Sequence, residues 1–161
     1  MCARVRIMFG GTFRDIVIRA GGLPKAAYEI QNLDGERVID VRHRFDRDLH
    51  PAPGAPEMPH LIALARLIRD ELVAREKGRL VVQCEAGQSR SARTVGAFLM
   101  LFNNWSKTQA MEELTKAYAN REPGCQQMMT RDLVLEWLNA LEIWIDAKGL
   151  AGAQATPDPK T

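Results

Sequence analysis

The chain has 161 residues, of which 46% are hydrophobic and 26% are charged, as expected for a single folded globular domain and not for a disordered chain. Its 22 basic and 20 acidic residues give a net charge of +2, which excludes a polycation that coats nucleic acid, so no nucleic-acid partner is expected. The most apolar stretch, VGAFLMLF, is far too short to span a bilayer, and no membrane partner is expected.

The first third of the chain predicts strands with one short helix. Residues 4–9 and 15–20 read as strands separated by a glycine turn. Residues 23–33 follow a Gly-Gly pair and carry a proline near their start, which predicts a short helix. Residues 37–45 read as a strand introduced by an Asp-Gly turn. The four prolines and one glycine of residues 46–59 predict a loop without regular structure, and loops of this length are often functional.

The remainder alternates a helix, a buried strand and three more helices. Apolar residues recur at helical spacing from Leu61, and Gly78 is the expected stop. The continuous apolar run of residues 79–84 predicts a buried parallel strand. A helix follows it, another is expected after Ser106 as N-cap, and the last is expected from about Thr130.

This alternation predicts an α/β fold: a central, mainly parallel twisted sheet of about four or five strands flanked by helices. Residues 1–149 are expected to form the single domain, and residues 150–161 a flexible tail. The three cysteines are too few and too odd in number for a disulfide framework. Free thiols and the lack of a leader pattern favour a cytoplasmic location.

The densest chemical signal is the segment CEAGQSRS at residues 84–91. A strand, a tight loop and a helix start together form an anion site, because the loop amides and the helix dipole present positive charge at one point. Arg90 adds a guanidinium fork that matches two phosphate oxygens. The expected phosphate-binding residues are Glu85, Ala86, Gly87, Gln88, Ser89 and Arg90.

The same positive environment activates Cys84. A thiol at a helix N-terminus beside a cation ionises more easily than a free one, which makes Cys84 a nucleophile aimed at the bound phosphorus. Ser91 is positioned to hydrogen-bond the sulfur when it leaves. The segment therefore predicts a catalytic site made of Cys84, Arg90 and Ser91.

The segment resembles the C-x5-R-[ST] signature of the cysteine-dependent protein tyrosine and dual-specificity phosphatases. The resemblance extends over residues 38–119, and RFDRDLHPAPGAP is similar to a stretch of a compact bacterial branch of that family. It implies a phosphatase-like fold and hydrolysis in two steps through a cysteinyl-phosphate, with an aspartic acid that protonates the leaving oxygen. Asp46 is the favoured general acid and Asp48 the alternative.

The resemblance also implies which partners to expect. The substrate would be a phosphorylated protein or a small phosphomonoester, and no metal or cofactor is implied. The three histidines lie too far apart, and without acidic or cysteine partners at ligand spacing, to predict a metal site. The sequence carries no prediction of the oligomeric state.

Two alternative functions remain. Gln83 stands where the family has histidine, and an amide cannot carry that charge. This departure favours slower chemistry, or a catalytically weak pseudophosphatase that only binds phosphate. A rhodanese-like sulfurtransferase also places a reactive cysteine loop after a strand, but its loop is usually one residue shorter, so this function ranks last.

Overall fold

The computed structural model describes residues 3–20, 30–33, 36–41, 51, 57–75, 78–84, 89–121 and 129–148. Five strands form one sheet in the order β1-β2-β5-β4-β3. The central strands β2, β5 and β4 run parallel, whereas β1 and β3 pair antiparallel at the two edges. The fold is therefore α/β with a parallel centre, as the alternation of elements predicts.

The predicted pair of N-terminal strands is confirmed as a hairpin. Strand β1 spans Ala3–Phe9 and β2 spans Thr12–Ala20, with Phe9 opposite Thr12. The turn between them needs positive φ at both positions, which Gly10 (60°) and Gly11 (83°) supply without steric cost. The other edge of β2 pairs with β5, and these two strands run parallel.

The helix expected over residues 23–33 is wrong at its end. Residues 21–29 lie outside the described part, but Ile30–Leu33 forms strand β3, which pairs with β4 at Glu36–Asp40. The cause is the Asp-Gly pair between them, because two apolar-containing segments joined by such a pair favour a hairpin over a helix.

The structure also corrects two boundaries around the long loop. Strand β4 ends at Asp40, whereas the strand was expected to extend to residue 45. Val41 lies beyond the strand but still donates a hydrogen bond from its N–H to the carbonyl of Gln83 (3.0 Å). Helix α1 spans Glu57–Ala74, so it begins inside residues 46–59, for which a loop without regular structure was predicted. Pro59 falls in its first turn, where proline removes no intrahelical hydrogen bond.

The elements after α1 follow the predicted order. Strand β5 spans Arg79–Cys84, α2 spans Arg90–Phe102, α3 spans Lys107–Ala119 and α4 spans Arg131–Lys148. Ser106 caps α3 in a reciprocal arrangement: its hydroxyl accepts from the N–H of Gln109, whose side chain accepts from the N–H of Ser106. The expected tail, residues 150–161, lies outside the described part.

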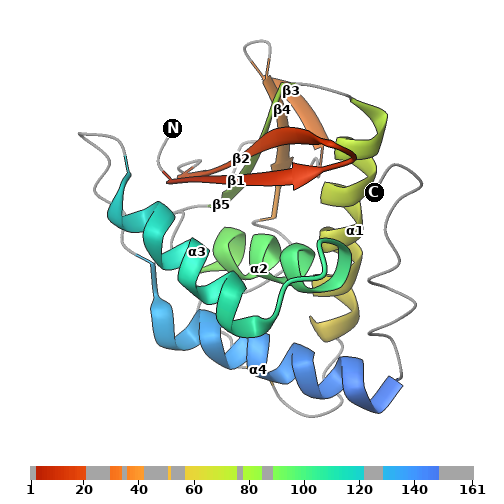
Figure 1. Cartoon of the computed structure of the whole chain (residues 1–161), viewed down its shortest axis with the longest axis vertical. Coiled ribbons are helices and arrows are strands. Elements are labelled where there is room, and N and C mark those ends of the chain that lie inside the picture. The colour runs from red at the N-terminus through yellow and green to blue at the C-terminus, as the bar shows by residue number, and fades with distance from the viewer. Residues whose placement is uncertain are drawn as a thin grey trace.

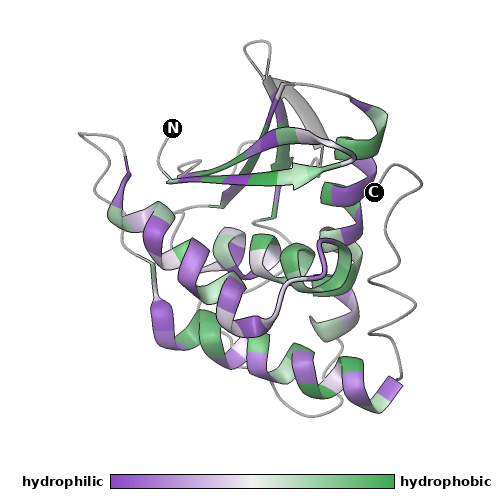
Figure 2. Cartoon of the chain, in the orientation of Figure 1, coloured by the Kyte–Doolittle hydropathy of each residue, from purple (hydrophilic) through white to green (hydrophobic). Residues whose placement is uncertain are grey.

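Figure 1 shows the sheet as one layer and helices α2, α3 and α4 together on one side of it. Helix α2 is buried along its whole length, whereas the buried residues of α3 and α4 recur every three or four positions. Figure 2 shows the matching alternation of hydrophilic and hydrophobic bands along α3 and α4. Helix α2, which carries Arg90 and Ser91 in its first turn, is therefore the most buried of the three helices.

The two faces of the sheet differ. The face toward the helices contributes Ile16, Ile18, Val82 and Cys84, among others, to the main core. On the opposite face, Val17, Val81 and Val38 form a second buried cluster across the three parallel strands. In the described part of the chain, no helix has both the length and the apolarity that crossing a bilayer requires.

Candidate active site

Cys84 is the last residue of the central strand. Strand β5 lies between β2 and β4, and its register places Cys84 opposite Ala20 of β2. The side chain is 2% exposed and packs in the core beneath the helices. A strand paired on both sides has little freedom to move, so the sulfur is held by the most constrained strand of the sheet.

Helix α2 begins six residues after the cysteine. Ser89 is its N-cap, and the carbonyl of Ser89 accepts the first helical hydrogen bond from the N–H of Arg93 at 2.9 Å. The Ser89 hydroxyl makes no capping bond. The amides of the first helical turn have no intrahelical acceptor, so they present donors and partial positive charge at the helix start.

Polar side chains crowd the buried first turn of α2. Arg90 is 7% exposed and Ser91 is fully buried. Burial of such groups is unfavourable unless each finds a partner. Thr94 meets this requirement by donating from its hydroxyl to the Arg90 carbonyl at 2.7 Å. Among the described residues, the hydroxyls of Ser89 and Ser91 have no hydrogen-bond partner, so both remain able to bind a sulfur or an oxyanion.

Arg93, one turn after Arg90, has a different role. It is fully buried and its guanidinium carbon lies 4.9 Å from the ring centroid of Trp137 in α4. This stacking ties the first turn of α2 to α4.

Gln83 bonds across the sheet on the face opposite Cys84. Its Oε1 accepts from Nε of Arg19 in β2, and its Nε2 donates to Oδ2 of Asp40 in β4, both at 3.0 Å. Gln83 is 4% and Asp40 1% exposed. Gln83 stands out in the sequence because histidine is expected there, but its partners cannot be predicted from the sequence, because the register of three strands brings them together.

Tyr118 of α3 is a further residue of this region that no sequence motif reveals. Burial raises the pKa of its phenol above the ordinary value, and the nearby Cys84 raises it further. The phenol is 4% exposed and stays protonated at physiological pH. Its position near Cys84 depends on the packing of α3, which no short sequence motif predicts.

Several predicted site residues lie outside the described part of the chain. These are the two candidate general acids and the body of the loop, namely Asp46, Asp48, Glu85, Ala86, Gly87 and Gln88. The structure therefore brings together Cys84, Ser89, Arg90 and Ser91 at one strand end and one helix start. Their roles, and the choice between Asp46 and Asp48, stay predictions.

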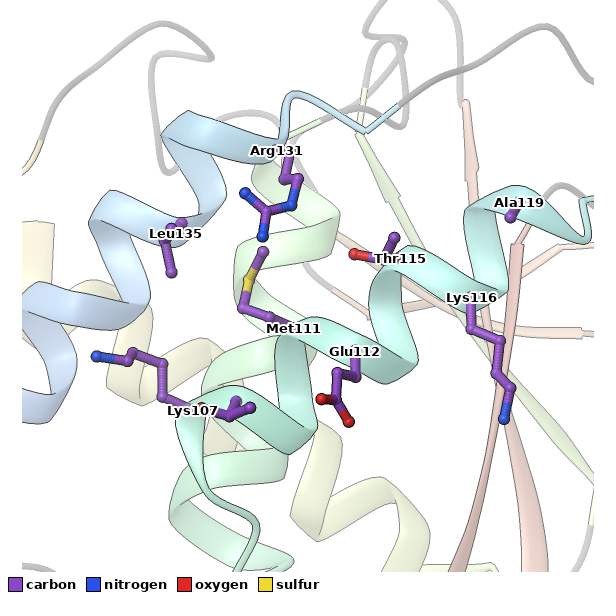
Figure 3. Close-up of a pocket in the computed structure, with 9 residues that line it drawn as sticks. Lys107, Met111, Glu112, Thr115, Lys116, Ala119, Arg131 and Leu135 are labelled. Atoms are coloured by element: carbon purple, nitrogen blue, oxygen red, sulfur yellow. The ribbon is translucent and has the colours of Figure 1, made fainter.

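A pocket of about 500 Å³ lies elsewhere, between α3 and α4. In Figure 3, Arg131 and Met111 point toward each other across it, and Lys107 and Leu135 lie along its length. Its lining contains no residue of β5 or α2. The cations at its rim pair with carboxylates, as Lys107 does with Glu142 at 3.1 Å, so the pocket is not the predicted phosphate site.

Comparison with known proteins finds relatives of one kind. The chain is 40% identical over 60 residues to phosphatidylglycerophosphatase and protein-tyrosine phosphatase 1 of Rattus norvegicus, a match that covers 37% of this chain and 31% of the relative. It is 43% identical over 53 residues to dual specificity protein phosphatase 13B of Mus musculus, covering 33% and 26%. The matches thus span about a third or less of each relative. No family model matches the chain.

Solved structures of the same kind also match. The crystal structure of PTPMT1 is 26% identical, with 57% of this chain and 53% of that chain covered and a TM-score of 0.40. A mouse dual specificity phosphatase complexed with zinc tungstate is 19% identical, with 81% and 98% covered and a TM-score of 0.43.

Both sequence relatives are phosphatases of the protein tyrosine and dual-specificity kinds, which supports the resemblance that the C-x5-R-S segment carries.

Proposed function

We propose that the protein is a phosphomonoester hydrolase that works through a cysteinyl-phosphate on Cys84. The observation that supports this most directly is the juxtaposition of the Cys84 strand end with the buried polar start of α2. A cation and two buried hydroxyls at the start of a central helix fit an oxyanion better than they fit a packing role.

In the first step, the Cys84 thiolate attacks phosphorus and the bond to the ester oxygen breaks. Asp46 gives its proton to that oxygen, so the alcohol or phenol leaves neutral. The fork of Arg90 binds two of the remaining phosphoryl oxygens, and the first-turn amides of α2 stabilise their charge. The enzyme then carries the phosphoryl group on sulfur.

In the second step, a water oxygen attacks the same phosphorus while the Asp46 carboxylate accepts a water proton. The phosphorus–sulfur bond breaks, its electrons return to Cys84 as a thiolate, and inorganic phosphate leaves. Ser91 donates a hydrogen bond to the departing sulfur, consistent with the buried hydroxyl that lacks a partner among the described residues.

The substrate class is a phosphomonoester, of which the relatives' names indicate two forms. One names a phosphatidylglycerophosphatase together with a protein-tyrosine phosphatase, and the other names a dual specificity protein phosphatase. Phosphorylated lipid and phosphorylated protein are therefore the first substrates to test beyond a generic aryl phosphate.

The test compares turnover of para-nitrophenyl phosphate by the wild-type chain and by Cys84→Ser. A serine hydroxyl at this position is a far weaker nucleophile than a thiolate, so turnover falls on the order of 10³-fold or more. Vanadate blocks the wild type. Cys2→Ser is the matched control and keeps full activity. Full activity of Cys84→Ser would refute the mechanism.

Asp46→Asn and Asp48→Asn then identify the general acid. Loss of a positioned acid costs about 10²–10⁴-fold in rate for a poor leaving group and less for a good one. We expect this dependence on the leaving group in Asp46→Asn, and little effect in Asp48→Asn. The reverse result would assign the role to Asp48.

A second candidate is a pseudophosphatase that only binds phosphate, because Gln83 replaces a histidine. Its signature is saturable binding of vanadate or phosphate without turnover in the wild-type chain. Turnover that depends on Cys84 would reject it.

A further inference from the structure

The side chain of Gln83 is the centre of a hydrogen-bonded bridge over three parallel strands. The sheet register sets Arg19 of β2 and Asp40 of β4 directly opposite Gln83 of β5. Nε of Arg19 donates to Oε1, and Nε2 donates to Oδ2 of Asp40, each at 3.0 Å. The amide thus joins a cation and an anion that lie two strands apart.

The contacts fix the orientation of this amide. A guanidinium only donates and a carboxylate only accepts, so the Gln83 oxygen must face Arg19 and its NH₂ must face Asp40. Both Gln83 and Asp40 are more than nine-tenths buried. A carboxylate in that position is costly unless it is hydrogen-bonded, so the bridge is held firmly.

The surroundings strengthen the bridge. Two residues earlier on the same strands and the same face lie Val17, Val81 and Val38, which are all buried. This apolar row supplies no polar group and lowers the local dielectric, which strengthens the hydrogen bonds beside it.

The centre of the bridge is the residue directly before the nucleophile in the sequence. Cys84 follows Gln83 directly, and because side chains alternate along a strand, its sulfur points to the helix side while the amide points away. Gln83 therefore acts on Cys84 through the backbone only. The hydrogen bond from the N–H of Val41 to the Gln83 carbonyl (3.0 Å) locks that backbone from the β4 side.

We infer that Arg19, Gln83 and Asp40 form a positioning bridge that holds the end of β5, and with it Cys84, in the geometry for attack on phosphorus. The inference rests on the proposed hydrolase function. In this role Gln83 supports catalysis, whereas the replacement of a histidine by glutamine would by itself indicate a loss of catalytic activity. The three groups together carry no net charge, and glutamine does not titrate.

A histidine at position 83 would behave differently. A neutral imidazole can donate to Asp40 from one nitrogen and accept from Arg19 at the other. An imidazolium has two donors and no acceptor, so the contact with Arg19 must break. Glutamine does not titrate, so its amide offers the same oxygen to Arg19 of β2 and the same NH₂ to Asp40 of β4 at every pH.

The first experiment measures kcat and KM of Gln83→Leu on para-nitrophenyl phosphate. Leucine is of similar size but makes neither hydrogen bond. We expect kcat to fall at least about tenfold, because small displacements of reacting groups are costly, with KM within about twofold. Arg79→Gln, at the other end of the same strand and face, is the control and leaves both unchanged. Wild-type kcat in folded Gln83→Leu would overturn the bridge.

A conservative pair tests whether the hydrogen bond itself matters. The oxygen of Asp40→Asn still accepts from Gln83, whereas Asp40→Ala removes the acceptor. We expect Asp40→Asn to retain several times more kcat than Asp40→Ala. Equal losses would contradict a role for this bond.

Gln83→His tests the bridge if Gln83→Leu does not fold. Its kcat/KM relative to wild type should fall up to about tenfold between pH 8 and pH 5.5, as the imidazole gains its proton. A constant ratio would overturn the inference.

Alkylation separates this inference from the proposed function. In a Cys2→Ser/Cys125→Ser background, iodoacetamide reports on Cys84 alone. If Gln83→Leu changes its alkylation rate about tenfold while Arg79→Gln does not, the bridge is supported, even if no phosphomonoester is hydrolysed. Unchanged alkylation and unchanged kcat would reject the bridge while leaving Cys84-dependent hydrolysis intact.

Discussion

Tyr118 shows how one buried side chain couples the site to stability. Its phenol is 4% exposed, and its pKa is raised first by burial and then by Cys84. A neutral phenol loses little when it leaves water, whereas a phenolate would lose its hydration. The folded state therefore keeps the proton under conditions in which the unfolded chain releases it.

This difference predicts an alkaline loss of stability. An unfolded tyrosine ionises near pH 10, so above about pH 10 the unfolded state binds fewer protons than the folded one, and the free energy of unfolding falls by about 1.4 kcal/mol per pH unit. Tyr118→Phe removes this contribution. Urea unfolding of both proteins at about pH 9 and pH 11 measures the free energy of unfolding at each pH. An equal decrease between the two pH values in wild type and in Tyr118→Phe would contradict a raised pKa of Tyr118 in the folded state.

Individual residues also show what a sequence can predict of a site. Cys84, Ser89, Arg90 and Ser91 are close in sequence, so the strand, loop and helix start that they occupy are visible in one short segment. Tyr118 is different, because it lies on a helix more than thirty residues after Cys84, and only packing brings the two residues near each other.

Helix α2 is the element that aims the site, and its packing depends on Gly96. A Cβ at this position would lie 2.9 Å from Cδ1 of Leu138 in α4 and 3.2 Å from Cδ1 of Leu114 in α3. Both leucines are fully buried and cannot move away freely. The absence of a side chain therefore sets how closely α2 approaches the two outer helices.

Gly96→Ala should lower the free energy of unfolding by about 1 kcal/mol. Overpacking costs about 1–3 kcal/mol, which exceeds the gain of about 0.5–1 kcal/mol from replacing a helical glycine. Urea unfolding measures the change. In a Leu138→Val background the cost should shrink, because the valine leaves room. Higher stability of Gly96→Ala in the wild-type background would show that the helices are not in close contact.

Helices and strands were predicted correctly where neighbouring residues in the sequence determine them. They were predicted wrongly where pairing with another segment determines them. The Ser106 cap, the glycine turn at Gly10 and the apolar run of β5 each depend on neighbouring residues, and the structure confirms them. Residues 30–33 became β3 because β4 pairs with them. Helix α1 begins at Glu57 because a proline in a first turn is not a helix breaker.

In the whole molecule, the order of the strands in the sheet determines which residues surround Cys84. Putting β5 between β2 and β4 brings Arg19, Gln83 and Asp40 together on one face and Cys84 on the other. The sequence indicates a parallel sheet but does not give the order of its strands, so the bridge could not be predicted. In parallel α/β sheets, ligands bind at the carboxyl ends of the strands, which is where Cys84 lies.

The position of the phosphoryl group during turnover distinguishes a cysteinyl-phosphate mechanism from direct hydrolysis by water. Wild-type protein is mixed with para-nitrophenyl phosphate, quenched with acid during turnover, and digested for mass spectrometry. A cysteinyl-phosphate mechanism predicts one phosphoryl group on the peptide that contains Cys84, and none in Cys84→Ser. Rapid turnover with no phosphoryl group on that peptide, or with the group on Ser91 instead, would contradict the account.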